Sequence, residues 1–236
     1  YQFDLLVMTH LHDDHIGCLP ELIKNGEVTA SKCLLMDPSF RWKVGANDSV
    51  ISNNALVDAL LEEDHSFLND SELQEFIDGS GALVDRYTEM IDKLKQDADK
   101  VMMFKGVDAN DYKLLETEFK SLGLKILGPT KKHLAITRDA LIGLVDTLTD
   151  VVKSSAFVDS APNDIERYRK LYKGSVTDSA IAMDAVKNKG SINDESIVLA
   201  FKSEGENSWS ALLAGDMQFA VPEVDGLEDE MKKLID

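Results

Sequence analysis

Alternating apolar positions open the chain. Phe3, Leu5 and Val7 recur at every second residue, which is the period of a β-strand with one buried face, so they predict a strand over residues 1–8. Short apolar runs bounded by turn residues predict further strands. These lie at residues 33–36, 101–104, 124–127, 196–201 and 209–214.

Two long stretches show apolar positions three and four residues apart, which is the period of an amphipathic helix. They cover residues of about 49–100 and 131–189, and the second is interrupted near Pro162 and Gly174. Shorter helices are expected over residues 20–25, 111–122 and 227–235. Strands and helices together predict an α/β (α+β) protein, and we expect one domain over residues 1–236.

Composition limits the classes of function. Hydrophobic residues make up 44% of the 236 residues and charged residues 29%, as in ordinary soluble domains, and no apolar run approaches the ~20 residues of a membrane span. The net charge of −18 argues against a nonspecific nucleic-acid binder. It does not exclude a phosphodiester substrate, because bound cations would invert the field locally. Cys18 and Cys33 fit no zinc finger, and as two buried thiols they would suit a reducing cytoplasm.

The strongest chemical signal lies directly after the first strand. Residues 9–17 read Thr-His-Leu-His-Asp-Asp-His-Ile-Gly, which places His10, His12, Asp14 and His15 in the spacing H-x-H-x-D-H. Imidazole and carboxylate ligands suit Zn²⁺, Mn²⁺ or Fe²⁺. A polar loop without a metal is the alternative, but three of the five histidines of the chain fall within six positions. We therefore expect a metal site, with room for two adjacent subsites.

Asp216 is the second candidate ligand. It follows an apolar strand and Gly215, so the chain could turn sharply and direct a carboxylate into a cleft. Gly-Asp alone is a common turn, but beside the histidine cluster a carboxylate that bridges two metals is the better interpretation. Thr9 either orients a ligand or simply ends the strand.

Three further polar residues are weaker candidates for a metal site. Asp13 is expected to be exposed. His65 lies in an acidic helical stretch, and His133 follows two lysines beyond a proline. We expect both histidines on the surface.

Several segments resemble the metallo-β-lactamase fold superfamily. Residues 9–17 resemble its first motif closely. Residues 193–199, Asn-Asp-Glu-Ser-Ile-Val-Leu, and residues 212–216, Leu-Leu-Ala-Gly-Asp, resemble a paired pattern in the branch related to the C-terminal domain of the DNA-uptake protein ComEC. The stop at residues 127–129, Leu-Gly-Pro, resembles the segment that precedes this pair. The resemblance implies an αββα sandwich, in which the stretches 49–100 and 131–189 are helical insertions.

The same resemblance implies a site and a reaction. His10 and His12 would bind one metal, Asp14 and His15 would bind the other, and Asp216 would bridge them. The expected enzyme is a hydrolase that uses a metal-bound hydroxide, which Asp14 could orient, on phosphodiester or related ester bonds. Its cofactor would be Zn²⁺, with Mn²⁺ or Fe²⁺ as alternatives, in a two-metal site of the complete protein.

The chain also departs from the family pattern. The family has one or two further strands ahead of the first motif, and this chain starts too late to hold them. It also lacks the His-His-Gly-Ser segment that the branch carries after its Gly-Asp strand, so we expect a domain that is incomplete at both ends. The expected substrate is a small-molecule or nucleic-acid phosphodiester, and no membrane is involved. One alternative is a small-molecule thioesterase or lactonase of the same fold. The other is a non-catalytic interaction module that contacts a protein partner through its helical insertions.

Overall fold

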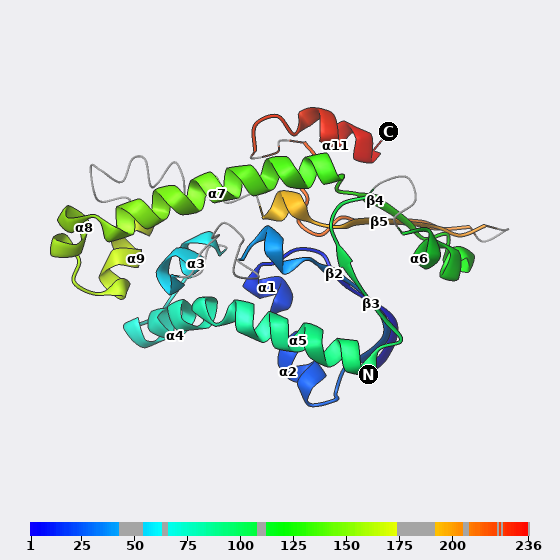
Figure 1. The fold of residues 1–236 in the computed structure, drawn as a ribbon, viewed down its shortest axis with the longest axis horizontal. Coiled ribbons are helices and arrows are strands. Elements are labelled where there is room, and N and C mark those ends of the chain that lie inside the picture. Colours follow the sequence, from blue (N-terminus) through cyan, green and yellow to red (C-terminus); the bar gives the residue numbers. More distant parts are fainter. Residues whose placement is uncertain are drawn as a thin grey trace.

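Two three-stranded sheets carry the β-structure of this protein (Figure 1). The computed structural model describes residues 1–42, 54–62, 66–107, 112–173, 192–204, 208–220, 222 and 224–235. The first sheet has the order β1-β2-β3 and is parallel; its strands are Gln2–Met8, Thr29–Met36 and Lys100–Phe104. The second sheet has the order β4-β5-β6 and is antiparallel; its strands are Lys125–Gly128, Val198–Lys202 and Ser210–Leu213. The protein is therefore a mixed α/β protein, as the sequence predicts.

Helices cover the first sheet because its parallel strands need crossover connections. Helix α2 (Leu19–Lys24) connects β1 to β2, and α5 (Leu83–Asp97) leads into β3; both lie on the same side of the sheet in Figure 1. The central strand is almost wholly apolar at its end, and Leu34 is completely buried. The hydroxyl of Tyr87 on α5 donates a hydrogen bond of 2.8 Å to the Met36 carbonyl, which ties this helix to the strand.

The second sheet has two apolar faces. Ile126 and Leu199 join the core that the first sheet builds, whereas their neighbours Leu127 and Val198 point to the opposite face, as alternation along a strand requires. That second face packs against α11 (Glu228–Ile235). The two sheets thus share one core, and the second sheet has a further helical covering.

A separate helical layer lies at one end of the molecule (Figure 1). Its elements are α3 (Ala55–Leu61), α4 (Asp70–Gly81), α7 (Lys131–Lys153), α8 (Ser155–Ser160) and α9 (Asp164–Lys173). The long helix α7 connects this layer to the rest, because Leu141 packs in the helical cluster, Leu134 in the core of the sheets and Ile136 against the cluster of α11. In the described part of the chain the other helical turns are α1 (Asp13–Ile16), α6 (Lys113–Glu118) and the 3₁₀ turns η1 (Pro38–Phe40), η2 (Lys120–Leu122) and η4 (Asn193–Glu195).

The predicted elements are present, with one change in their grouping. β2 begins four residues before the predicted start at residue 33. The helical stretch 49–100 is divided, because α3 and α4 join the helical layer while α5 packs in the core of the sheets. Residues 49–53, 63–65 and 174–189 of the two helical stretches, and the turn at 205–207, lie outside the described residues.

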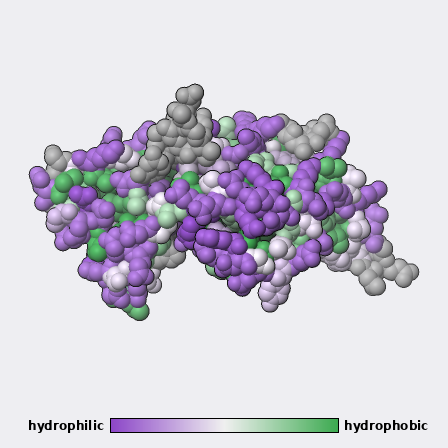
Figure 2. Space-filling view, turned by 60° about the horizontal axis from the view of Figure 1, so that its bottom comes forward, coloured by the Kyte–Doolittle hydropathy of each residue, from purple (hydrophilic) through white to green (hydrophobic). Residues whose placement is uncertain are grey.

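Hydrophilic side chains cover most of the face shown in Figure 2, consistent with the excess of acidic residues. Among the helices that the structure describes, none combines the length and the apolar character that a membrane crossing requires.

The shared core predicts a strong effect of Leu34. Replacing it by alanine should lower the free energy of unfolding by about 2–5 kcal/mol, since the cavity would lie between a sheet and its covering helices. Leu68, whose side chain is 90% exposed, gives a matched control, and Leu68→Ala should change the free energy by less than about 0.5 kcal/mol. Denaturant unfolding measures both values. Equal effects of the two substitutions would contradict the described core.

Candidate metal centre

The histidine motif lies where β1 leaves its sheet. The Thr9 carbonyl accepts a hydrogen bond of 2.9 Å from the amide of Ile197, which precedes β5, so this point is fixed between the two sheets. The chain then passes through His10 and His12 into the single turn of α1, which Gly17 ends with a φ of +47°. The motif therefore sits at the carboxyl end of a parallel strand, as the sequence predicts.

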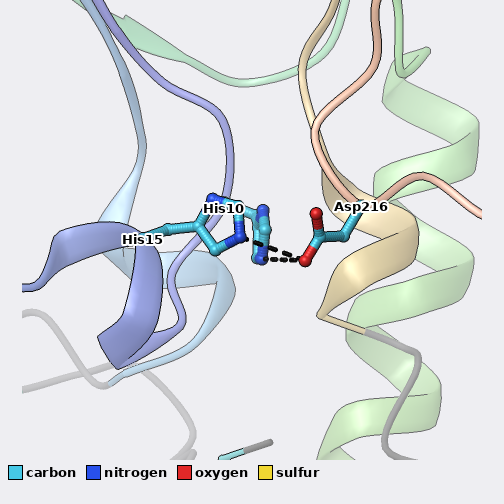
Figure 3. A group of neighbouring side chains, drawn as sticks. All are labelled: His10, His15 and Asp216. Carbon is cyan, nitrogen blue, oxygen red and sulfur yellow. Dashed lines mark hydrogen bonds and ion pairs between the residues drawn. The ribbon is translucent and has the colours of Figure 1, made fainter.

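Asp216 approaches this motif from the end of the second sheet. It follows β6, and its Oδ2 atom lies 3.0 Å from His15 Nε2 and 3.8 Å from His10 Nε2 (Figure 3). The three ligand atoms all lie within 4.8 Å of one another. The prediction that Asp216 approaches the histidine cluster is confirmed by this geometry, although 201 positions separate Asp216 from His15.

The spacing of these atoms fits a metal ion. Zinc binds imidazole nitrogen and carboxylate oxygen at about 2.0–2.2 Å, so two ligand atoms of a tetrahedral site lie about 3.4 Å apart. The two distances to Asp216 Oδ2 bracket this value. Within the described part of the chain, His10, His15 and Asp216 are the group of three that could hold a cation.

His10 is oriented by hydroxyl groups behind it. Its Nδ1 atom lies 3.1 Å from Ser196 Oγ and 3.2 Å from Thr9 Oγ1. An Nδ1–H group that donates to these oxygens leaves the lone pair on Nε2, which faces Asp216. The Nε2 atom is buried and has no hydrogen-bond partner. A buried polar atom without a partner is costly, and a metal ion would satisfy it. Thr9 therefore lies where it can orient the His10 ring, which is the first of the two interpretations given for it.

His12 lies beside this group of three rather than within it. Its ring centroid is 5.1 Å from that of His10, and its Nε2 atom lies 3.1 Å from the Leu61 carbonyl oxygen at the end of α3. A carbonyl oxygen only accepts, so Nε2 carries the hydrogen and Nδ1 carries the lone pair. That Nδ1 atom is also buried and forms no hydrogen bond of normal geometry, although the Asn193 side chain lies close enough to raise the pKa of the ring.

Burial keeps both inner imidazoles neutral. Burial first, and then the neighbouring His12, His15 and Arg41, together lower the pKa of His10 to about 2. Burial, followed by the Arg41 charge, lowers the pKa of His12 to about 3. A metal ligand must be deprotonated, so protons do not compete for these nitrogens near neutral pH.

Asp14 reaches the cluster from the solvent side. Its side chain is 41% exposed, and its Oδ2 atom lies 3.5 Å from His15 Nε2.

One of the two cysteines is buried as predicted. Cys33 is buried, and burial raises its pKa to about 11. Cys18 is exposed, so the prediction that it is buried is wrong. The side chain of Cys18 lies just before α2 at the surface, where the apolar neighbours in sequence point inward.

Two of the residues assigned to the surface lie elsewhere. Asp13 is half-buried, since its carboxylate accepts a hydrogen bond of 2.8 Å from Arg86. His133 is fully buried on α7, and its Nε2–H donates a hydrogen bond of 2.7 Å to the Asp194 carbonyl. Both surface predictions are wrong because the partners are distant in sequence. His65 lies outside the described residues.

Ser196 and Gly215 also shape this group of side chains, although neither was predicted as a site residue. The Ser196 hydroxyl oxygen accepts a hydrogen bond of 3.1 Å from the Asp216 amide while it contacts the ring of His10. Gly215 adopts a φ of +55° directly against this contact, where an added Cβ would lie 2.9 Å from Ser196 Oγ and 3.0 Å from Thr9 Oγ1. Only their positions in the quoted segments 193–199 and 212–216 could have indicated them.

Gly215 should therefore be required for metal affinity. Gly215→Ala would push apart the hydroxyls that orient His10, and we expect a loss of about 10–100-fold in Zn²⁺ affinity. Gly226 is the matched control, because its φ is +88° but an added Cβ there meets nothing within 4 Å. Gly226→Ala also places a side chain at a positive φ and should retain the affinity. Competition titration with a zinc indicator compares them, and equal affinities would contradict this role.

The low pKa values of His10 and His12 predict their titration in the metal-free protein. Their ring ¹⁵N shifts should remain those of neutral imidazole at pH 5, whereas a histidine peptide titrates near 6.5. The unfolded chain gains protons on these rings below about pH 6.5 and the folded chain does not. Stability due to the two rings is therefore complete above that pH and decreases as the pH falls. Midpoints near 6.5 in the folded protein would refute the buried placement.

Comparisons with known proteins do not assign this chain to a family. No family model, no curated protein and no solved structure matches it. The case for a metal centre therefore rests on the arrangement of the side chains themselves: two buried imidazoles with free lone pairs, a third histidine and a carboxylate from a distant strand.

Proposed function

We propose that this protein is a metal-dependent hydrolase with the metallo-β-lactamase fold, of the ComEC-like branch. The observation that carries the proposal is the buried Nε2 atom of His10, which has no hydrogen-bond partner and faces His15 and Asp216. A site that served only to hold the loop in place would pair this nitrogen with a protein group. A histidine nitrogen that faces a second histidine and a carboxylate is typical of a catalytic metal site.

The arrangement of layers supports the proposed αββα sandwich. Both sheets contribute to one core, with Leu34 from β2 and Leu199 from β5 in the same cluster. Helices α2 and α5 pack on the side of the first sheet, and α11 packs on the outer face of the second. The site lies where the two sheets meet, between the end of β1 and the end of β6.

The proposed chemistry is hydrolysis by an activated water molecule. A bound divalent cation would lower the pKa of its water ligand and would polarise the oxygen of the bond that is cleaved. His10, His15 and Asp216 would hold the cation, and His12 would add its Nδ1 atom. The exposed carboxylate of Asp14, 3.5 Å from His15 Nε2, would orient the water and accept its proton. Imidazole and carboxylate ligands favour Zn²⁺, with Mn²⁺ or Fe²⁺ as alternatives.

The proposed substrate is a phosphodiester or a related ester, either a small molecule or a nucleic acid. The resemblance of residues 193–199 and 212–216 to the ComEC-like pattern favours the phosphodiester. The net charge of −18 favours the second candidate, a small neutral thioester or lactone, because the surface repels polyanions. A cytoplasmic location, expected for a chain with free cysteines, is part of this proposal.

A substrate comparison with an Asp216 variant tests the proposal. The Zn²⁺- or Mn²⁺-loaded protein should hydrolyse bis-p-nitrophenyl phosphate faster than a thioester. Removing an outer partner of a metal ligand costs about 10–100-fold in activity, and Asp216→Asn should lower the rate of hydrolysis by more than that because it changes a ligand itself. Asp225→Asn, at an exposed aspartate on the same segment, should retain the activity.

The reverse order of the two substrates would favour the thioesterase or lactonase. A protein that binds no metal and hydrolyses neither substrate would refute the hydrolase. That result would instead support an interaction module whose helical layer, α3, α4 and α7 to α9, contacts a protein partner.

A further inference from the structure

A fully buried arginine lies behind the metal loop. Arg41 follows β2 and η1, and its side chain has no exposed surface. Its guanidinium donates one hydrogen bond to the Leu11 carbonyl, which lies between His10 and His12 in the chain, and another to the Glu62 carboxylate. The guanidinium thus connects the backbone of the histidine motif to the end of α3.

Glu62 holds the same loop at its next peptide group. Its Oε1 atom accepts from Arg41, and its Oε2 atom accepts a hydrogen bond of 2.8 Å from the Asp13 amide. The backbone is therefore fixed immediately before and immediately after His12. The neighbouring Leu61 carbonyl accepts from the His12 ring itself. Two consecutive residues at the end of α3 thus determine the position and the tautomer of one imidazole.

Stability alone does not explain a buried ion pair at this position. Well-packed apolar side chains in place of a buried pair often give equal or greater stability, because both charges lose their hydration. What apolar side chains cannot supply is a donor for Leu11 and an acceptor for Asp13. The pair occupies the point where the core of the sheets meets the helical layer, since α3 packs with α4, α7 and α9.

We propose that Arg41 and Glu62 are positioning residues for the metal site, and that through them the helical layer fixes the position and the tautomer of His12 beside that site. The proposal rests on the proposed metal site for its functional meaning. Its physical content, a backbone held on both sides of His12, can be measured without a metal.

The experiment uses one double variant, one isosteric variant and one control. Arg41→Met with Glu62→Leu replaces both charges by apolar side chains of similar length and leaves neither partner alone. Glu62→Gln keeps an acceptor for the Asp13 amide but removes the charge. Glu116→Gln is the control, because Glu116 likewise accepts from a backbone amide, that of Ile126, and pairs with a cation, Lys125, outside the metal loop.

Two measurements are made on the full chain. In the metal-free protein, hydrogen exchange of the Asp13 amide and the ring ¹⁵N shifts of His12 report the positioning. In the loaded protein, Co²⁺ titration with visible absorption reports affinity and ligand geometry. We expect the double variant to lose the exchange protection and the single His12 tautomer, to bind Co²⁺ about 10–100-fold more weakly and to show a changed spectrum. Glu62→Gln should show smaller changes in the same direction, and Glu116→Gln should show none.

A folded double variant with unchanged Asp13 exchange and an unchanged His12 tautomer would overturn the positioning role. If the double variant does not fold, Glu62→Gln decides in the same way, and values equal to those of Glu116→Gln overturn the role. A wild-type chain that binds no Co²⁺ would refute the metal site. The exchange and ¹⁵N measurements are made without metal, so they test the positioning role independently of metal binding. Failure of the metal site and failure of the positioning role can therefore be distinguished.

Discussion

Burying two neutral imidazoles beside a carboxylate requires partners for the peptide groups of the loop that carries them. The loop that carries His10 and His12 is short and irregular, so its peptide groups cannot bond to one another as they would in a helix or a sheet. Their partners come from distant parts of the chain: Ile197 for the Thr9 carbonyl, Arg41 for the Leu11 carbonyl and Glu62 for the Asp13 amide. The remainder of the fold brings these three partners to one place.

Each layer of the protein has a role in that arrangement. The first sheet supplies the strand that ends at the motif, and the second sheet supplies Ser196 and Asp216 from the opposite side. The helical layer supplies the end of α3, where Leu61 and Glu62 contact the loop. The helical stretch around α3 is therefore connected to the site by hydrogen bonds, although its described residues contain no cluster of metal-ligand type. This connection gives a physical reason why a helical layer could influence chemistry at the sheets.

Much of this could be predicted from the sequence, because strands, helices and local motifs leave periodic or clustered signals. His10, His12, Asp14 and His15 lie within six positions directly after the first strand, and Asp216 follows an apolar strand and a glycine. Both signals are local in the sequence. The partners of these residues gave no local signal. His133 was expected on the surface, and nothing in the neighbouring sequence singles out Arg41 or Glu62. Only the fold shows that their partners are the carbonyl of Asp194 and the backbone of the metal loop. Burial of a polar side chain depends on contacts over long sequence separations, which a pattern of neighbours does not record.

The central claim is that His10, His15 and Asp216 share one cation. The most direct test is a crystal of this chain grown with Zn²⁺ or Co²⁺, with anomalous diffraction data collected on both sides of the absorption edge of the metal. We expect an anomalous peak between His10 Nε2, His15 Nε2 and the Asp216 carboxylate, at about 2.0–2.2 Å from each ligand atom. A peak bound elsewhere, or none at saturating metal with these three side chains in the arrangement described, would contradict it.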